Sequence, residues 1–426
     1  MARGISYALS DFTLLPGYTP RDATLDKIDL RTPGVKYFSP TKRELPPDEN
    51  PSAIMLNKPY YSAKMQAVFS PLLAVRLAEE GGMAVAHQSQ DIDAEVRSIR
   101  EVKRYKAGFV VPDVVSPHMT IEAIAKMAEE RGYSTFPVTD DGTLNGRFIG
   151  YITKNDYHKI KHADMQVYER MLRVDLSDRG SSQVFFAWDD EVNDDLHDAD
   201  AILVEGHHGS LPIVKKYGTL KYIVFKKDIA THLDNPNELV DSNKSYMIGA
   251  GANTHDYEDR IPELIKAGCD MIFFDNSDSD GFFAEDAANY MQRRYKGFPF
   301  ALGNFVTEAG AKLAMDLGAY SVGIGIGIGS ICTTSENIDI GSGQATAVMN
   351  GRKAQKKHLA ETGVYVPIYA DGGITRERFK ETMSGRRRSK QEQDELRELD
   401  EGHQIAKALA LGADSVMMGR YFARFE

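Results

Sequence analysis

Short apolar segments alternate along this chain with longer segments whose apolar residues recur at helical spacing. A short apolar run bounded by turn residues is typical of a buried strand, whereas the longer periodic segments indicate amphipathic helices. Alternating strands and helices predict an α/β fold with a parallel sheet, and eight repeats favour a closed TIM (β/α)8 barrel over an open, doubly wound sheet. The expected strands are Tyr60–Lys64, Met83–Gln88, Tyr246–Ala252, Met271–Ser277, Phe298–Asn304, Tyr320–Gly327, Tyr365–Gly373 and Ser415–Gly419, and the expected helices are Pro71–Glu80, Asp256–Ala267, Ala284–Tyr295, Thr307–Leu317 and Gly402–Leu411.

Polar and glycine residues stand where most of these strands end. In a TIM barrel all strands end at one face, and the catalytic residues come from that face. The sequence therefore predicts a site built from residues that are far apart along the chain. The strand endings are Ser62–Lys64, Asp275–Asn276–Ser277, Asn304, Gly325–Ile326–Gly327, Asp371–Gly372–Gly373 and Gly419–Arg420.

The segment between the second and third strands breaks this rhythm and contains a weak internal repeat. One copy has Phe136–Pro137–Val138 before a turn at Gly142, and the other has Leu211–Pro212–Ile213 before a turn at Gly218. Each copy predicts two strands joined by a glycine turn and followed by a helix. We therefore expect the barrel to comprise residues 1–100 and 236–426, with an insert at 101–235.

A second, charged insertion separates the seventh strand from the helix at 402–411. It runs from Thr375 to Glu401 and contains the basic run Gly385-Arg386-Arg387-Arg388-Ser389-Lys390, followed by residues of mixed charge. Mixed charge is typical of a solvated helix. Binding of phosphate or of a partner by the arginines is the alternative.

Composition limits what this protein can be. Its 42 % hydrophobic and 27 % charged residues are typical of a soluble globular protein. The 51 basic and 62 acidic residues give a net charge of −11, which argues against nucleic-acid binding as a main function. No apolar run approaches the roughly 20 residues that span a bilayer, and the N-terminus lacks the apolar core of a signal peptide. Two cysteines cannot form a disulfide framework, so we expect a reducing, cytoplasmic location.

The richest chemical signal is the glycine-rich run from Gly325 to Thr334, which contains Cys332 flanked by hydroxyl residues. Glycines let the backbone turn tightly and bring its N–H groups close to an anionic ligand. Such N–H groups also favour the thiolate form of a cysteine, which is the nucleophilic form. We therefore interpret Cys332 as a nucleophile and Cys269, just before an apolar strand, as a buried structural residue.

The loop that contains Cys332 resembles the corresponding loop of a known family. The loop Gly329-Ser330-Ile331-Cys332-Thr333-Thr334 is similar to the active-site loop of inosine-monophosphate (IMP) dehydrogenases and GMP reductases. Further similar motifs follow in family order over nearly the whole chain. They are Asp11-Phe12 with Leu15-Pro16-Gly17-Tyr18, Gly303-Asn304, Gly341 with Gln344-Ala345-Thr346-Ala347-Val348, Ala370-Asp371-Gly372-Gly373-Ile374, the segment from Ile405 to Ala413, and Val416-Met417-Met418-Gly419.

The resemblance implies an activity and a role for each matching residue. The cysteine attacks C2 of the purine, a hydride passes to NAD, and hydrolysis releases xanthosine monophosphate (XMP). The implied nucleophile is Cys332, with Thr334 beside it on a mobile loop. The implied nucleotide contacts are Met65, Asn304, Ser330, Asp371 (ribose hydroxyls), Gly372, Gly373, Gly419 and Arg420. The implied NAD contacts are Asp275, Asn276, Ser277, Gly325 and Gly327. A potassium ion would bind the carbonyls of Gly327, Gly329 and Cys332.

The resemblance also extends to the insert and to assembly. The repeated segment is similar to a tandem of CBS modules, which in many proteins bind adenine or guanine nucleotides. A spacer that binds no nucleotide is the alternative, and the acidic Asp189-Asp190-Glu191 stretch disfavours phosphate binding in the second copy. The family forms tetramers, so we expect a homotetramer.

Several positions depart from the family pattern. The family usually has Ser-Pro-Met-Asp after the first strand, where this chain has Ala63-Lys64-Met65-Gln66. A basic residue before the glycine loop is replaced by Gly323, and a serine after the last strand is replaced by Arg420, which could make a bidentate phosphate contact. His87 matches a histidine near the cofactor, although a core histidine is an equal interpretation.

Two other functions stay open at this stage: a GMP reductase that uses NADPH, and a nucleotide-binding regulator without catalysis. The sequence ends at Glu426, soon after the last strand, where the resemblance implies a further helix, a mobile flap with an Arg–Tyr pair and part of the potassium site. The sequence as it stands therefore predicts that hydride transfer is retained while hydrolysis is impaired.

Overall fold

The computed structural model contains two compact units. One unit is Met1–Ile99 with Met247–Glu426, and the other is Arg100–Tyr246. The structure describes residues 5–18, 20, 24, 27–39, 54–105, 108–110, 112–131, 133–193, 195–253, 255–276, 279–328, 339–374 and 402–424.

Eight parallel strands form the core of the first unit. They are β4 (Tyr60–Ser62), β5 (Ala84–Ala86), β12 (Ile248–Ala252), β13 (Met271–Asp275), β14 (Phe300–Phe305), β15 (Ser321–Ile324), β17 (Ile368–Asp371) and β18 (Ser415–Met418). Each strand pairs with its successor in the chain, and β18 pairs with β4. Ser62 N donates to Met83 O (3.1 Å), and Met83 N donates to Tyr60 O (3.0 Å). These bonds join β4 to β5 and close the barrel, which confirms the predicted TIM fold.

Aromatic side chains fill the middle of the barrel. Tyr61, Phe273 and Tyr369 come from three different strands and are fully buried. Their ring centroids lie 5.4–5.9 Å apart, at the separation that favours edge-to-face packing. This layer supports the polar residues that follow at the carboxyl ends of the same strands.

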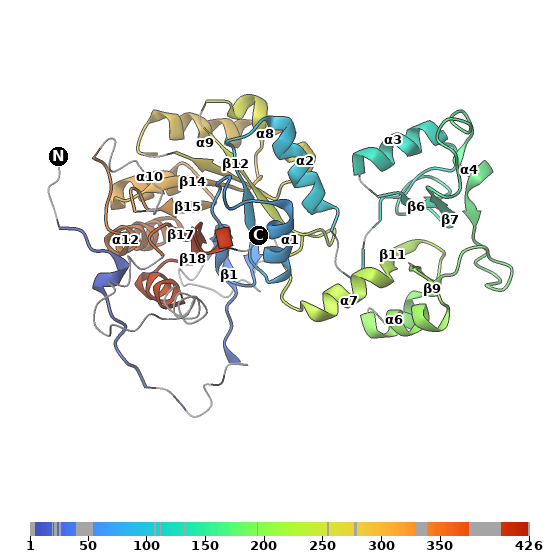
Figure 1. The fold of residues 1–426 in the computed structure, drawn as a ribbon, viewed down its shortest axis with the longest axis horizontal. Coiled ribbons are helices and arrows are strands. Elements are labelled where there is room, and N and C mark those ends of the chain that lie inside the picture. Colours follow the sequence, from blue (N-terminus) through green and yellow to red (C-terminus); the bar gives the residue numbers. More distant parts are fainter. Residues whose placement is uncertain are drawn as a thin grey trace, which may run out of the picture. The chain divides into compact units, whose positions relative to one another are not determined.

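Helices cover the outside of the barrel (Figure 1). They are α1 (Pro71–Glu79), α2 (Ile92–Lys103), α8 (Tyr257–Ala267), α9 (Phe282–Arg294), α10 (Glu308–Asp316), α12 (Gln344–Thr362) and the helix at 402–411. Two of the predicted helices begin at side-chain caps, because Ser70 accepts from Leu73 N and Thr307 accepts from Gly310 N. All five predicted helices are present, with ends that shift by up to two residues.

The sequence analysis missed α12, the 19-residue helix that follows the cysteine loop. Its buried face mixes small residues such as Ala345 and Gly351 with the polar Gln344, Gln355 and His358. A Cβ atom on Gly351 would lie 2.9 Å from Ile324 Cδ1 on β15, so the helix packs directly against the barrel at this position. Because a buried face of small and polar residues gives little apolar periodicity, the sequence pattern did not reveal this helix.

Four short strands at the other end of the barrel were also missed. β1 (Thr32–Pro33) pairs with β3 (Met55–Leu56), and β2 (Tyr37–Phe38) pairs with β16 (Val364–Tyr365). Lys36 N donates to Tyr320 O, one residue before β15 begins. The segment at 32–38 therefore covers the amino ends of the strands, opposite the predicted site.

A buried ion-pair network ties α2 to α8. Arg260 contacts Glu95 at 2.5 Å and Asp256 at 2.7 Å, and both Arg260 and Glu95 are almost inaccessible to solvent. Removing one partner of an ion pair buried this deeply would leave an uncompensated charge and destabilise the fold.

The second unit repeats one motif twice. β6 (Thr135–Thr139) pairs with β7 (Phe148–Thr153), and β10 (Ser210–Val214) pairs with β11 (Leu220–Phe225). Each hairpin shifts register near the end of its first strand and follows a helix, α3 (Ile121–Arg131) or α6 (Leu196–Glu205). The repeat seen in the sequence is therefore a repeat of structure.

The helix predicted after each hairpin forms only in the second copy, as α7 (Lys226–Asp234). In the first copy the chain after Thr153 makes turns instead, so this prediction was wrong. The physical difference is apolar anchoring: Ile229 of α7 is buried, whereas Ile160 in the first copy is exposed. A helix without a buried face gains little stability from tertiary packing.

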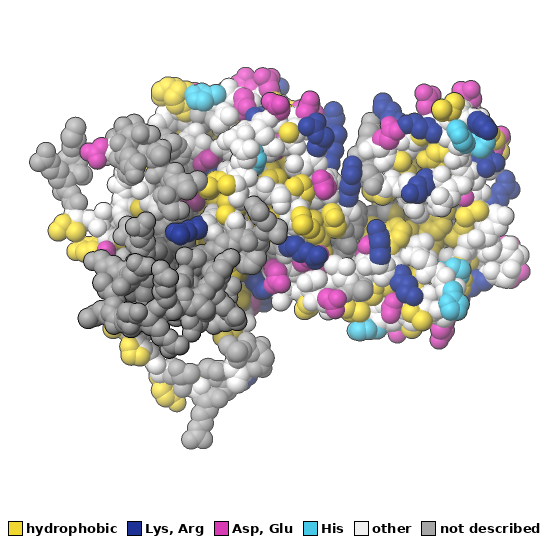
Figure 2. Space-filling model, in the orientation of Figure 1, with side chains coloured by type: hydrophobic (Ala, Val, Ile, Leu, Met, Phe, Trp, Pro, Cys, Tyr) yellow, Lys and Arg dark blue, Asp and Glu magenta, His cyan; other side chains and the backbone are white. Residues whose placement is uncertain are grey.

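The surface of the described residues carries both signs of charge. Figure 2 shows Lys and Arg side chains among Asp and Glu side chains on the face drawn. Within the described ranges, no helix has the length and apolar composition needed to cross a membrane.

Candidate active site

The strand register places the predicted polar residues at one level of the barrel. Asp275 at the end of β13 pairs with Gly303 on β14, and Asp371 at the end of β17 pairs with Met417 on β18. Because all these strands are parallel, both carboxylates stand at the carboxyl face, where barrel enzymes carry their chemistry.

A buried lysine joins these two carboxylates. Lys64 Nζ lies 3.2 Å from Asp275 Oδ1 and 3.3 Å from Asp371 Oδ2, and its side chain is 4 % exposed. Burial alone would lower the pKa of Lys64, but the charges of Asp275 and Asp371 outweigh it and raise the pKa above its ordinary value. Lys64 therefore carries a full positive charge at the mouth of the barrel.

Asn304 connects β14 to the same cluster. Its Nδ2 donates to Asp371 Oδ2 (2.9 Å) and to the carbonyl of Gly325 (2.8 Å), where the glycine-rich run begins. Asn304 Oδ1 is buried and accepts no hydrogen bond from a described residue. The predicted residues Asn304, Asp371 and Gly325 are thus in direct contact.

Two glutamines that the sequence analysis gave no role complete the cluster. Gln88 Nε2, just beyond β5, donates to Asp275 Oδ2 (2.7 Å). Gln344 Nε2, at the start of α12, donates to the backbone carbonyls of Ile324 and Asp371. Gln88 lies at a strand end like the predicted residues, so its position in the sequence could have indicated a role in the site. Nothing in the local sequence pattern marks Gln344, although it lies in one of the similar motifs.

Glycine is required at two of the predicted positions. Gly325 has a φ of 140°, and a Cβ atom there would lie 2.2 Å from Asp371 O. Gly373 has a φ of 67°, and its Cβ would lie 3.2 Å from Gln344 Cβ. The backbone at both strand ends therefore approaches its neighbours closely, in conformations that favour glycine.

Other predicted nucleotide contacts lie around this mouth. Met65 Sδ is 3.2 Å from the position of a Cβ on Gly419, so these two residues face one another. Gly372 N donates a long bond to Met417 O (3.4 Å), and Asn276 exchanges backbone bonds with Gly303 and Asn304. Arg420 is exposed to solvent.

The described residues do not include the whole predicted site. Ser277, Gly329, Ser330, Cys332 and Thr334 lie outside them, as does the charged insertion at 375–401. The described part of the chain stops at Ile328, whose side chain lies near Gly373 at the mouth, and resumes at Asp339.

The histidine and the second cysteine lie in the core. His87 is buried, its ring packs edge-on against Phe69, and burial lowers its pKa. The side chain next to it, Gln88, is the one that reaches Asp275. Cys269 is buried just before β13, as expected for a structural residue.

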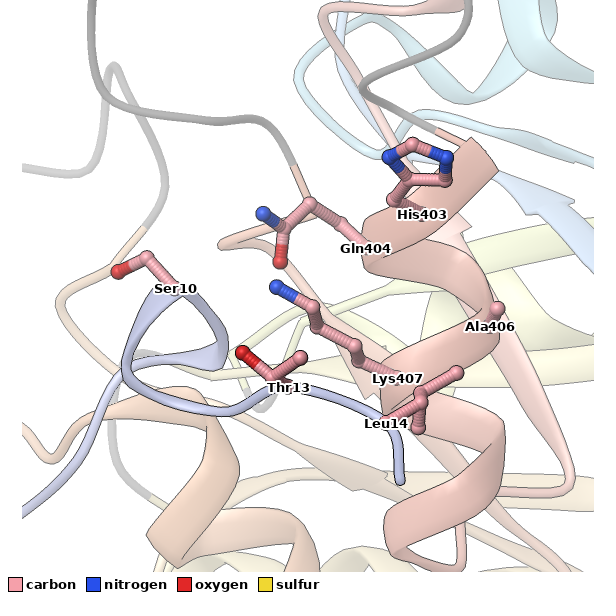
Figure 3. Close-up of a pocket in the computed structure, with 7 residues that line it drawn as sticks. All are labelled: Ser10, Thr13, Leu14, His403, Gln404, Ala406 and Lys407. Atoms are coloured by element: carbon pink, nitrogen blue, oxygen red, sulfur yellow. The ribbon is translucent and has the colours of Figure 1, made fainter. Parts of the chain in front are cut away.

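A separate pocket lies beside the first turns of the helix at 402–411. Its volume is about 370 Å³, and its walls come from that helix and from the N-terminal segment. Figure 3 shows the side chains of Thr13, Gln404 and Lys407 directed toward one space between these elements. None of the predicted site residues lines this pocket.

The barrel and its mouth define a class of protein before any comparison. A closed (β/α)8 barrel with charged and amide groups at its strand ends, beside a glycine-rich loop, has the architecture of a TIM-barrel enzyme.

Comparison with known proteins identifies the family. The family model described as "IMP dehydrogenase / GMP reductase domain" matches residues 7–379. Inosine-5'-monophosphate dehydrogenase of Tritrichomonas foetus is 34 % identical over 423 residues, which are 99 % of this chain and 75 % of the relative. The Haemophilus influenzae enzyme of the same name is 31 % identical, over 88 % of this chain and 68 % of its own length. This chain belongs to the IMP dehydrogenase / GMP reductase family and is an oxidoreductase.

A solved structure is similar in fold. GMP reductase from Trypanosoma brucei, in complex with guanosine 5'-triphosphate, superimposes with a TM-score of 0.65 at 22 % identity. The match covers 99 % of this chain and 88 % of that one. At this identity the similarity concerns the fold alone.

Proposed function

We propose that this protein oxidises IMP to XMP with NAD through a covalent intermediate on Cys332. The observation that carries the proposal is the cluster at the mouth in which Lys64 joins Asp275 to Asp371, and Asp371 accepts from Asn304. Relatives named inosine-5'-monophosphate dehydrogenase, at 28–34 % identity over 99 % of the chain, support the choice of substrate.

The described residues are suited to holding the nucleotide. Asp371 Oδ2 accepts from Lys64 and Asn304, which fixes the carboxylate, while its Oδ1 accepts from no described residue. A carboxylate held in this way can accept hydrogen bonds from two ribose hydroxyls. Backbone amides at Gly373 and Gly419, with Ser330, would receive the phosphate.

The chemistry follows from the cysteine. In our proposal the Cys332 thiolate adds to C2 of IMP, and the hydrogen at C2 leaves as a hydride to NAD. This yields NADH and a purine joined to sulfur at C2. Water then adds at C2, the thiol leaves, and XMP is released; Thr334 would lie beside this reaction on the same loop.

The hydride acceptor would bind along β13. Asp275 is partly exposed at the mouth and is held by Lys64 and Gln88, so its carboxylate can accept hydroxyl groups of a dinucleotide. Asn276, Ser277, Gly325 and Gly327 would line the same site. Only β14 lies between β13 and β15, the strand that precedes the loop with Cys332, which agrees with hydride transfer between two neighbouring ligands.

We also propose that the protein binds a potassium ion and forms a homotetramer. Gly327, with a φ of 77°, is the only predicted potassium ligand among the described residues. A cation held by its carbonyl and those of Gly329 and Cys332 would order the cysteine loop by charge–dipole interaction.

We further propose that the insert regulates the barrel, as a tandem of CBS-like modules that bind adenine or guanine nucleotides. Its chain enters and leaves at one place, because Tyr246 N donates to Tyr105 O (3.2 Å) and Lys103 pairs with Asp241 (2.8 Å). The unit also has its own apolar cores, including one around Phe148, Phe186 and Ile223. A unit built in this way can be removed without opening the barrel.

Replacing residues 106–236 by a short Gly/Ser linker should therefore leave turnover per active site within about threefold of wild type, since none of the proposed site residues is lost. Steady-state assays of the folded variant, with and without added ATP or GTP, measure this. We expect nucleotides to change the rate of the wild type but not of the variant. A folded, correctly assembled variant without activity would contradict the separation of roles.

GMP reductase is the second candidate function, because structural relatives of that name share the fold. The two activities are distinguished by assay at 340 nm. With IMP and NAD we expect absorbance to rise, and with GMP and NADPH we expect no fall. The reverse pattern would replace the proposed function with the reductase.

A further inference from the structure

One charged side chain at the mouth is not used by the proposed chemistry. Lys64 stands where the family usually has the proline of Ser-Pro-Met-Asp, so the resemblance assigns it no role. It is nevertheless the only cation among the described residues that touches Asp275 and Asp371.

Among the described residues, the ammonium group of Lys64 has no anionic partner besides Asp275 and Asp371. Its third contact is the sulfur of Met417 at 3.7 Å, on the strand beside β17. The titratable groups that act on its charge are Asp275 on β13 and Asp371 and Tyr369 on β17. Tyr61, on the strand that precedes Lys64, packs its ring against Tyr369 in the layer below.

The neighbouring strand β15 cannot supply this charge. A Cβ atom on Gly323 would lie 2.6 Å from the hydroxyl oxygen of Tyr369 and 2.9 Å from Asn304 Oδ1. These groups fill the space that a basic side chain at position 323 would need. In this chain the positive charge at the mouth therefore comes from Lys64, just after β4, and not from this strand.

We propose that Lys64 is a positioning residue: its ammonium group holds the carboxylates of Asp275 and Asp371 as one unit and so sets the orientation in which both accept ligand hydroxyls. The proposal rests on the function proposed above, because it assigns Asp371 to the nucleotide and Asp275 to the dinucleotide. Asp275 uses one oxygen for Lys64 and the other for Gln88, whereas Asp371 uses one oxygen for both Lys64 and Asn304. Without the lysine, the two partly buried carboxylates would have no counter-ion among the described residues.

The first test needs no ligand. Lys64→Met keeps the length of the side chain but removes its charge, and Lys58→Met is the matched control. Lys58 precedes the same strand at the other end of the barrel and pairs with Glu80. In Lys64→Met the two carboxylates repel each other without a counter-ion, and uptake of a proton by the pair relieves this repulsion, so the loss of Tm should be larger at about pH 8 than at about pH 4.5. A loss of Tm that is the same at both pH values would mean lost packing and would overturn the proposal.

The second test measures binding. We expect the affinity of Lys64→Met for IMP, and separately for NAD, to fall by at least about tenfold, with Lys58→Met unchanged. Equal affinities in Lys64→Met and wild type would contradict a positioning role. If wild-type protein binds no IMP, the proposed function fails, and the ligand-free Tm comparison still decides whether Lys64 holds the two carboxylates.

A double variant covers the case in which Lys64→Met fails to fold. Adding Asp275→Asn removes one of the two facing charges, so Lys64→Met/Asp275→Asn should fold and have a higher Tm at about pH 8 than Lys64→Met. The proposal would be overturned if adding Asp275→Asn to Lys64→Met lowered the Tm by as much as Asp275→Asn lowers it in the wild type.

Discussion

Cys332→Ala should abolish turnover while nucleotide binding persists. In the proposed reaction the thiolate forms the bond to C2, and no other described or predicted group can replace it. Loss of a nucleophile typically removes several powers of ten in rate, so we expect a fall in kcat of more than about 1,000-fold. The affinity for IMP, measured by calorimetry, should change by less than about tenfold, because Asp371 and the glycine turns remain.

The other cysteine gives the matched control for this variant. Cys269 is buried outside the site, so Cys269→Ala should retain near wild-type turnover. If Cys332→Ala keeps turnover within about tenfold of wild type, about 1.4 kcal/mol in barrier, the cysteine is not the nucleophile.

Asp371→Asn is expected to have the second largest effect, and mainly on KM for IMP. The carboxylate accepts from Lys64 and Asn304 on one oxygen and offers the other oxygen to the ligand. An amide has one acceptor oxygen, so its NH2 group must face either these donors or the ribose hydroxyls. Two weakened hydrogen bonds to a charged acceptor correspond to about 3 kcal/mol, or a rise in KM of roughly 100-fold.

The control for Asp371→Asn is Asp316→Asn. Asp316 ends α10, is 48 % exposed and pairs with Lys312, and a surface pair of this kind contributes little. Steady-state kinetics should show an unchanged KM for Asp316→Asn. An Asp371→Asn variant with the KM of the wild type would remove Asp371 from the nucleotide site.

The barrel could be predicted from the sequence because each strand is a short apolar run with a polar or glycine ending. The same rule located Asp275, Asn304 and Asp371, since parallel strands end at one face. The pattern could not reveal α12, whose buried face mixes small and polar residues, or the two-residue strands β1, β2, β3 and β16. Strands of that length carry no periodicity.

The contacts within the site could be predicted only in part. Lys64 was visible as a departure from the family pattern, but its partners come from β13 and β17, more than 200 residues away in the sequence. The pairing depends on barrel closure, which brings β4 beside β18 and across from β13. Gln88 and Gln344 were missed for the same reason, because their roles depend on contacts that only the tertiary structure defines.

The most direct test of the account is to trap the covalent intermediate. Protein incubated with IMP and NAD is quenched in acid, and its intact mass and tryptic peptides are measured. We expect formation of NADH together with an added purine nucleotide on the peptide that contains Cys332, and no adduct when NAD is omitted or in Cys332→Ala. NADH formed without any adduct on that peptide, or an adduct on another residue, would contradict catalysis through Cys332.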